Sequence, residues 1–245
     1  MMKKVLFASL LALSLGACKT LDVASAIEAG SSLFQAASIS DDEMKAIGLQ
    51  SAQKLDAENK TAPASNAYAK RLNKITKNFK SYNGIPLNFK VYLTKSVNAF
   101  ALPNGDVRVY AGLMDLMTDD EVLFVVGHEI GHVIEGHSKA RMRTNLLATA
   151  ARQAAVASGN SIASTLSSGE IGELAHNFVN AQYSQSQEYD ADTFGLKILK
   201  ENNRPKEAGV SALRKLASLN GGSNASILSS HPDSLKRAER IANMK

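Results

Sequence analysis

The sequence contains one cysteine and no tryptophan among its 245 residues. A single thiol excludes an intramolecular disulfide framework and the zinc sites that need two or four cysteines. Any metal site must therefore use histidine and carboxylate side chains. Aromatic residues make up only 6% of the chain and the net charge is +5, so there is neither a strongly basic surface nor a tryptophan platform for stacking bases. We expect no nucleic-acid partner.

Hydrophobic residues make up 44% of the chain, an ordinary fraction for a globular protein of one domain or two small ones. Near the N-terminus, Lys3 and Lys4 precede an uncharged apolar run over residues 5–17. As a helix this run would be roughly 20 Å long, too short for the ~30 Å hydrocarbon core of a bilayer. A basic start and a short apolar run are typical of a signal peptide.

The apolar run ends in Leu15-Gly16-Ala17-Cys18, which resembles the lipobox of bacterial lipoproteins. The resemblance implies that the preceding residues are removed and that the sulfur of Cys18 carries lipid. An ordinary signal peptide with a coincidental cysteine is the alternative. Because Lys19 follows rather than aspartate, the resemblance implies an outer-membrane protein that faces the periplasm. The predicted division is a signal peptide over 1–17, a lipid-anchored tether over 18–40 and a folded domain over 41–245.

Beyond the tether, the pattern indicates a short β region between helices. Ser40, followed by three acidic residues, predicts a helix start, and Pro63 fits the first turn of a second helix. Apolar and polar residues alternate over 87–93, and two short runs flank Pro103-Asn104-Gly105 as in a hairpin. We predict an α+β fold, mostly helical, with a small antiparallel sheet. The expected elements are helices over 41–58, 63–80, 112–117, 118–136, 138–157, 170–200, 205–219 and from Pro232, strands over 87–93, 97–102 and 106–110, and a loop over 158–169.

The helix over 118–136 carries His128-Glu129-Ile130-Gly131-His132, an HExxH motif. Residues four apart share a helix face, so both imidazoles can reach one metal, and Glu129 can reach a water bound to it. The alternative is a helix with two packed structural histidines. The strongly apolar residues 122–126 predict that this helix is buried. Buried histidines and a buried glutamate need partners, and a metal supplies them.

The third ligand decides the class of metal site. The metzincin pattern fails because Gly136 and His137 are each out of place, and at 100° per residue His137 faces away from His132, so we expect a surface or capping residue there. A glutamate from another helix is the alternative. Glu188 is favoured because Asp192, four residues later, could accept the other ring N–H of a ligand histidine; a solvated carboxylate is the competing interpretation. The other downstream candidates are Glu170, Glu173 and Glu201.

The segments HEIGH, QEYDADTFG and SSHPDSLKRAERI together resemble metallopeptidase family forty-eight, the HtpX-like gluzincins. The lipobox and the segment NAFALPNGDVRVYAGLMDLM add a similarity to outer-membrane lipoprotein proteases of that family. The resemblance implies a zincin-type domain with its small sheet beside the HExxH helix. It also implies one zinc ion held by His128, His132 and Glu188, with Asp192 behind them. It implies that His231 lies near the metal, as an oxyanion donor or as a blocking fourth ligand, and that Arg237 assists.

The implied activity is a zinc endopeptidase that cleaves unfolded or misassembled envelope proteins, with Glu129 assisting the attack of zinc-bound water. Asn98, Ala99 and Phe100 would belong to an edge strand that pairs with the substrate backbone; a plain core hairpin is the alternative. The expected partners are unfolded envelope polypeptides and the membrane, through the lipid anchor. Two other functions stay open: a chaperone-like lipoprotein with latent proteolysis, and a structural lipoprotein in which His231 completes a closed zinc site.

Overall fold

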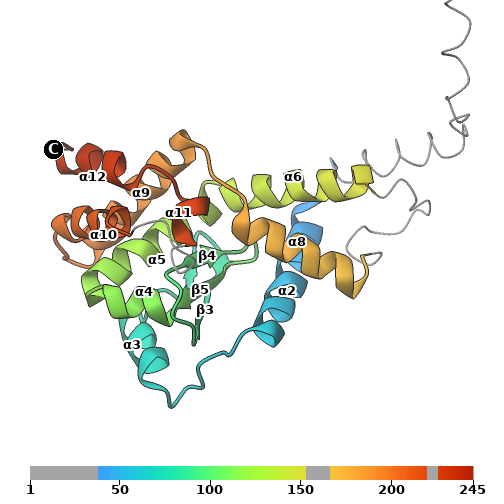
Figure 1. Ribbon diagram of the computed structural model, residues 1–245, viewed down its shortest axis with the longest axis horizontal. Helices are drawn as coiled ribbons and strands as arrows, with labels where there is room; N and C mark the ends of the chain where they lie inside the picture. The colour runs from blue at the N-terminus through green and yellow to red at the C-terminus, as the bar shows by residue number, and fades with distance from the viewer. Residues whose placement is uncertain (1–37, 153–165, 220–225, 245) are drawn as a thin grey trace, which may run out of the picture.

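The computed structural model describes residues 38–152, 166–219 and 226–244 (Figure 1). The predicted signal peptide, Cys18 and nearly all of the tether lie outside these residues, as does most of the predicted loop over 158–169. The described helices are α2 (Asp41–Glu58), α3 (Ala67–Ile75), α4 (Ala111–Leu116), α5 (Asp119–Ile134), α6 (His137–Arg152), α8 (Ser168–Asn180), α9 (Gln185–Glu201), α10 (Glu207–Ala217), α11 (Ile227–Ser230) and α12 (Ser234–Ala242). The strands are β1 (Ser81–Tyr82), β2 (Ile85–Pro86), β3 (Asn88–Tyr92), β4 (Ala99–Ala101) and β5 (Asp106–Tyr110).

The main sheet has the strand order β3-β5-β4. The predicted hairpin is confirmed, with β4 antiparallel to β5 and Phe100 opposite Arg108. The prediction of a wholly antiparallel sheet was wrong, because β3 runs parallel to β5, with Val91 opposite Val109. The alternation over 87–93 reports which face of the strand is buried, but not which strand it pairs with. After β3 the chain enters β4, which lies on the other side of β5 and runs antiparallel to it. β5 then lies between the two strands and runs in the same direction as β3.

Side-chain caps fix where the long helices begin. Ser40 and Thr118 each form a capping box with a glutamate three residues later, as their sequences predict for α2 and α5. Ser167 with Glu170 and Ser184 with Gln187 form two further boxes, at the starts of α8 and α9. The single helix predicted over 170–200 is wrong. α8 ends at Asn180, because Ala181 is extended with ψ 146°, and α9 starts afresh after Ser184, whose side chain accepts from the Gln187 N–H.

The second predicted helix starts later than Pro63. Thr61 forms a bridge to Tyr92, and the Ala62 N–H donates to the Val91 carbonyl, so the chain around Pro63 is tied to β3. α3 begins only after Asn66, whose side chain accepts from the N–H of Tyr68. The predicted C-terminal helix likewise begins two residues after Pro232, at Ser234, and the short helix α11 precedes it.

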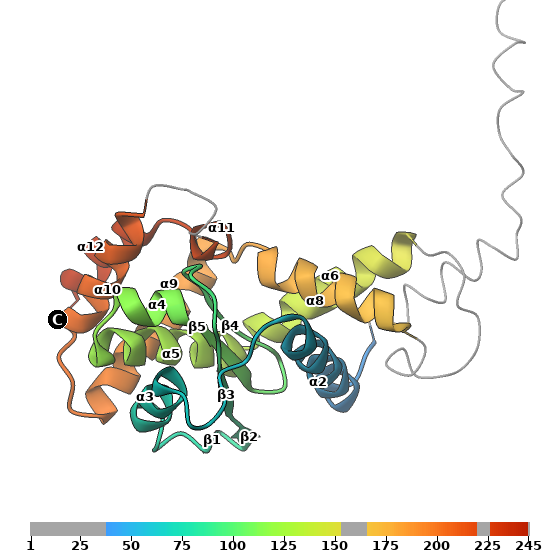
Figure 2. The same cartoon turned by 60° about the horizontal axis from the view of Figure 1, so that its bottom comes forward.

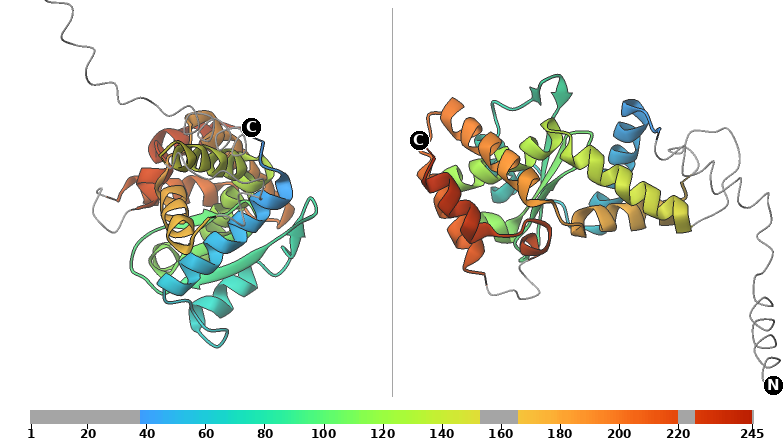
Figure 3. Two further views of the ribbon diagram at one scale, coloured as in Figure 1. Left: turned by 90° about the vertical axis from the view of Figure 1, so that its right-hand side faces the viewer. Right: turned by 90° about the horizontal axis from the view of Figure 1, so that it is seen from above.

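The helices form two groups around the sheet. α2, α6 and α8 pack together at one end of the molecule (Figure 2). α5 runs through the other part, against β4 and β5 on one side and against α9 and α10 on the other (Figure 3). The predicted position of the sheet beside the HExxH helix is thus confirmed. Within the described ranges, no helix combines the length and apolar character needed to cross a bilayer.

Glycines allow α5 and α9 to approach closely. A Cβ built on Gly131 would lie 2.8 Å from the Cβ of Phe194 and 3.1 Å from the Cα of Ala191. A Cβ on Gly127 would lie 2.9 Å from the Cβ of Ile198. Any side chain larger than hydrogen would push the helices apart. This contact brings the HExxH face of α5 against the N-terminal half of α9.

A buried ionic cluster ties α2 to the sheet. Arg108 on β5, 1% exposed, binds Asp56 of α2 side-on, through Nε at 2.8 Å and Nη2 at 3.0 Å. Lys90 and the hydroxyl of Tyr92 also donate to Asp56, at 2.7 and 2.8 Å. Burial raises the pKa of Asp56, but these donors outweigh it and hold that pKa below its usual value. The cluster fixes the group of α2, α6 and α8 to the part of the molecule that carries the HExxH helix.

Candidate metal centre

Four buried side chains converge where α5, α9 and the residue after α11 meet. One atom from each of His128, His132, Glu188 and His231 lies within 4.8 Å of the others. The Nε2 atoms of His128 and His132 are 3.1 Å apart, and Glu188 Oε1 lies 3.3 Å from His132 Nε2. Of the downstream glutamates considered from the sequence, only Glu188 joins this cluster among the described residues.

The donor chemistry of the cluster fits a cation. Asp192 Oδ1 lies 3.0 Å from His128 Nδ1, and Arg237 Nη2 lies 3.3 Å from the same nitrogen. In the tautomer in which Nδ1–H donates to Asp192, His128 Nε2 carries a lone pair. His132 Nδ1 lies 3.1 Å from His137 Nδ1; if it donates there, His132 Nε2 also carries a lone pair. Two lone pairs facing each other beside a carboxylate repel unless a positive ion lies between them. Two histidines and a glutamate are the ligand set of gluzincin-type zinc sites.

Arg237 on α12 holds the carboxylates of α9 in place. Its Nε and Nη2 donate side-on to Asp192, at 2.9 and 2.6 Å, and its Nη1 forms an ion pair with Glu188. All three side chains are at most 2% exposed. A histidine ligand backed by a carboxylate is fixed in tautomer and ring orientation. The structure therefore brings Asp192 and Arg237 to the rear of the cluster.

Burial and neighbouring charges set the protonation of the site. Burial raises the pKa of Glu188, but its electrostatic interactions with His231 and Arg237 outweigh that effect and hold the pKa far below the usual range. Burial also raises the pKa of Glu129, with only partial compensation from His231 and His128. Burial lowers the pKa of His132 well below 6.5. Glu188 is thus ionised, as a metal ligand would have to be, His132 is neutral, and Glu129 is the more basic carboxylate.

Glu129 faces His231 across the cluster. Its Oε1 lies 3.5 Å from His231 Nε2, is fully buried and has no hydrogen-bond partner among the described residues. The other ring nitrogen of His231, Nδ1, lies 3.0 Å from Glu188 Oε1 and 3.3 Å from His128 Nε2. His231 therefore bridges the glutamate of the motif and the cluster of ligand atoms.

His137 is not the surface residue that the sequence predicts. It is 9% exposed and lies beside His132. The reason is Gly136, which has φ +76°, a conformation that ends α5 and turns the chain back before α6 begins. The rule of 100° per residue therefore stops applying before His137 is reached. Its Nε2 lies 3.9 Å from Oδ2 of Asp190, an exposed residue of α9. His137 therefore links the buried His132 to the exposed carboxylate of Asp190.

An aromatic residue absent from the sequence predictions lines the site. Tyr183, in the break between α8 and α9, stacks on the ring of His132 with centroids 3.7 Å apart and planes 10° apart. Its N–H donates to the carbonyl of Ser230, the residue before His231. Arg141 of α6 lies over the Tyr183 ring, 4.0 Å from its centroid. No spacing in the sequence links these residues, because they meet only through the packing of α6 and α8.

The candidate substrate strand, β4, is an edge strand of the described sheet. Leu102 and Asn98 form the hydrogen-bonded pairs with β5, so the N–H and C=O groups of Ala99 and Ala101 point away from it. Ala99 N–H donates to the Asn98 side chain and Ala101 C=O accepts from Ser138 Oγ. The Ala99 carbonyl and the Ala101 N–H are the other two groups on that edge.

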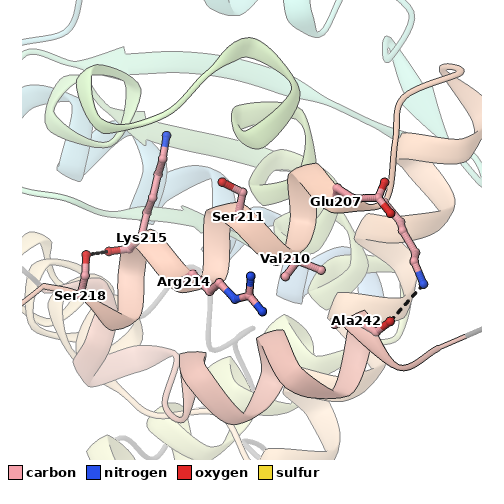
Figure 4. A pocket seen from close by; sticks show the side chains of 8 residues that line it. Glu207, Val210, Ser211, Arg214, Lys215, Ser218 and Ala242 are labelled. Carbon is pink, nitrogen blue, oxygen red and sulfur yellow. Dashed lines mark hydrogen bonds between the residues drawn. The ribbon is translucent and has the colours of Figure 1, made fainter.

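The remaining candidates lie elsewhere. Glu170 belongs to the capping box of α8, Glu173 lies on the same helix, and Glu201 at the end of α9 pairs with Lys197. A separate cavity of about 620 Å³ lies against α10 and the end of α12 (Figure 4). Lys215, on its wall, is already bound to Glu121 at 2.7 Å. The cavity has no histidine in its lining, so it is not a second metal centre of this type.

Comparison with known proteins gives a consistent result. Residues 66–245, which include every member of the cluster, match Peptidase family M48. Metalloprotease YcaL of Escherichia coli (strain K12) is 43% identical over 222 residues, 90% of this chain and 87% of that protein. Metalloprotease LoiP of the same organism is 40% identical over 240 residues, 98% of this chain and 95% of that protein. The mitochondrial metalloendopeptidase OMA1 of Arabidopsis thaliana is 28% identical over 60% of this chain and 29% of its own length.

Proposed function

This chain belongs to peptidase family M48 and is a metalloendopeptidase, and we propose that it is a lipid-anchored zinc enzyme that cleaves unfolded or misassembled envelope proteins. The observation that carries the chemistry is the convergence of His128, His132 and Glu188 within 4.8 Å, beside a buried glutamate. One zinc ion would be held by these three side chains. When bound, it would polarise the scissile carbonyl and acidify the attacking water.

Glu129 is the general base of this proposal. Its Oε1 is buried without a hydrogen-bond partner among the described residues, and burial raises its pKa, so it can accept a proton from the attacking water. It then delivers that proton to the leaving amine. Asp192 and Arg237 hold His128 and Glu188 in the orientation that leaves their ligand atoms facing inward. His231, 3.5 Å from Glu129, can donate to the oxyanion that develops on the substrate.

The substrate would lie along β4. The Ala101 N–H and the Ala99 carbonyl point away from β5, but both residues are at most 1% exposed. An extended peptide that displaces the groups covering this edge could accept from that N–H and donate to that carbonyl. Asn98 directly precedes this strand, and Phe100 lies between Ala99 and Ala101. Backbone pairing of this kind tolerates many sequences, which suits a protease for unfolded chains. The proposed location in the cell envelope rests on the lipobox-like segment that ends at Cys18 and on the similarity to LoiP over 98% of this chain.

The test of the activity is cleavage of an unfolded protein such as casein by the purified, zinc-loaded enzyme. Glu129→Gln preserves shape but removes the base, and we expect at least a 100-fold loss of kcat (order of magnitude from general-base catalysis). Glu173→Gln, on the outer face of α8, is the matched control, with the same chemical change away from the cluster. Equal activity of wild type and Glu129→Gln would refute the proposal.

The ligand set and the anchor have their own tests. Glu188→Ala should lower the zinc content of the purified protein, measured by metal analysis; full stoichiometry in that variant would remove Glu188 from the ligand set. Cys18→Ser should shift the protein from the membrane to the soluble fraction of the cell envelope. Unchanged fractionation would argue against a lipid anchor at Cys18.

One observation favours a second candidate, a chaperone-like lipoprotein with latent proteolysis. His231 Nδ1 lies among the ligand atoms, and the Ile227 N–H at the start of α11 donates to the Val97 carbonyl beside β4. The segment over 226–231 thus contacts both the cluster and the candidate substrate strand. If it holds the enzyme latent, His231→Ala should cleave casein faster than wild type. Slower cleavage by that variant would instead support His231 as the oxyanion donor.

A further inference from the structure

Arg141 of α6 is a buried arginine whose charge has no carboxylate partner among the described residues. The residue is 8% exposed, and its Nε and Nη2 atoms are fully buried without a hydrogen-bond partner. Burying an unpaired guanidinium is costly, because the charge leaves water and gains no counter-charge. Either other contacts of the guanidinium offset this cost, or a bound ligand supplies the missing counter-charge.

Aromatic contacts account for only part of this cost. The guanidinium lies 4.0 Å from the ring centroid of Tyr183 and 4.9 Å from that of Phe178. Cation–π contacts of this kind use the flat faces of the guanidinium. The N–H groups point outward in its plane, so an aromatic ring over a face does not satisfy them. The unpaired Nε and Nη2 edge still needs an acceptor.

The other fully buried arginines show what this edge binds in the same protein. Arg108 grips Asp56 through Nε and Nη2, and Arg237 grips Asp192 through the same two nitrogens. This side-on fork matches the two oxygens of one carboxylate. Arg141, at 8% exposed against 1% and 2% for the other two, presents the same buried Nε and Nη2 edge with no carboxylate among the described residues.

The position of Arg141 relates it to the scissile bond. Tyr183 stacks on His132 at 3.7 Å and carries Arg141 at 4.0 Å, so the guanidinium is one aromatic ring removed from a ligand of the cluster. Its charge also makes a minor contribution that opposes the rise in the pKa of Glu129 caused mainly by burial. An extended peptide advances about 3.3–3.6 Å per residue, so the separation between the His132 ring and Arg141 corresponds to about three residues of substrate.

We propose that Arg141 is a specificity-determining residue that binds a carboxylate of the substrate, within about three residues of the cleaved bond. The carboxylate belongs to an aspartate or glutamate side chain, or to the C-terminus of the polypeptide. This inference rests on the proposed peptidase function and names a substrate feature for that same site. It makes the enzyme more than a sequence-blind protease, because backbone pairing with β4 alone carries no preference for charge.

The test uses matched peptides that differ only in Glu or Gln, walked through the three positions on each side of the cleaved bond. Wild type should prefer Glu at one position by about 10- to 100-fold in kcat/KM, the range of a buried charge-assisted pair. Arg141→Met, of similar length and without charge, should reduce that ratio to near one, and Arg141→Lys should keep part of it. Peptides with free and amidated C-termini distinguish a side-chain carboxylate from a terminal one.

Two further measurements separate this role from a structural one and from failure of the peptidase function. Arg141→Met should unfold at the same temperature as wild type or higher, because it removes an unpaired buried charge; a lower midpoint with an unchanged Glu/Gln ratio would overturn the proposal. Fluorescence anisotropy of labelled Glu and Gln peptides on Glu129→Gln protein measures the preference without catalysis. Tighter binding of the Glu peptide than of the Gln peptide, lost when Arg141→Met is added, supports the inference even if casein is never cleaved. Equal binding of the two peptides overturns the inference even if casein is cleaved.

Discussion

The contact of α5 with α9 predicts opposite outcomes for the same substitution at two glycines. Gly131 and Gly172 both lie inside helices, so alanine gains about 1 kcal/mol of helix propensity at either position. At Gly172 the new Cβ would meet only the flexible end of Lys54, at 3.1 Å, which can move aside. At Gly131 it would lie 2.8 Å from Phe194 Cβ and 3.1 Å from the backbone of Ala191.

Overpacking against a fixed backbone costs about 1–3 kcal/mol, which exceeds the gain in propensity. We therefore expect Gly131→Ala to lower the free energy of unfolding by about 1 kcal/mol, whereas Gly172→Ala raises it by about 1 kcal/mol. The shift also reaches the site, because Ala191 lies between Glu188 and Asp192 on α9. Displacing these side chains from the histidines should weaken zinc binding by about 10- to 100-fold.

Urea unfolding followed by circular dichroism measures the two stabilities, and competition with a chromogenic chelator measures the zinc affinity of each variant. Gly172→Ala serves as the matched control, since its helix holds no ligand of the cluster. If Gly131→Ala is stabilised as much as Gly172→Ala and binds zinc as tightly as wild type, the close approach of α5 and α9 does not position the site.

Three further outcomes follow from the structure. Asp56→Asn removes the charge that faces buried Arg108 and should cost about 3 kcal/mol in urea unfolding; Asp106, 3.0 Å from Arg108, keeps the loss from being larger. The pKa of Asp56 is lower in the folded protein than in the unfolded chain. The stability that its charge contributes is therefore complete above the unfolded pKa and is lost as the pH falls through the folded pKa. Below about pH 4, the stability of Asp56→Asn should accordingly fall less than that of wild type. Asp192→Asn should weaken zinc binding about 10- to 100-fold with little change in the size of the side chain, measured by chelator competition. Chelation should lower the unfolding temperature, and above the dissociation constant each tenfold increase in free zinc should restore about 1.4 kcal/mol; a midpoint insensitive to zinc would contradict a site formed only in the folded protein.

Local signals in the sequence predict the elements that carry the motif. Ser40 with Glu43 and Thr118 with Glu121 predict the starts of α2 and α5, because the cap and its partner are only three residues apart. The parallel pairing of β3 with β5 could not be predicted in the same way, since it depends on the path of the chain between strands. Ser184 with Gln187 is an equally local signal that sequence reasoning missed.

The residues of the site also separate into those that local spacing predicts and those that meet only in the folded chain. His128 and His132 share a helix face, and Glu188 with Asp192 shares another, so spacing alone favours both pairs. His231 is 43 residues beyond Glu188 and joins them only in the folded chain; the family resemblance, not its spacing, pointed to it. His137, Tyr183 and Arg141 carry no pattern at all, because their roles arise from the turn at Gly136 and from the packing of α6 against α8.

Arg237 on α12 has a consequence for the order in which the protein matures. It neutralises Glu188 and Asp192, two carboxylates that are otherwise buried against each other's charge. α12 follows α5 and α9 in the sequence, so a chain still emerging from the ribosome holds both acids without their counter-charge. The charges around Glu188 and Asp192 are therefore balanced only after α12 has been made, although both acids lie on the earlier helix α9.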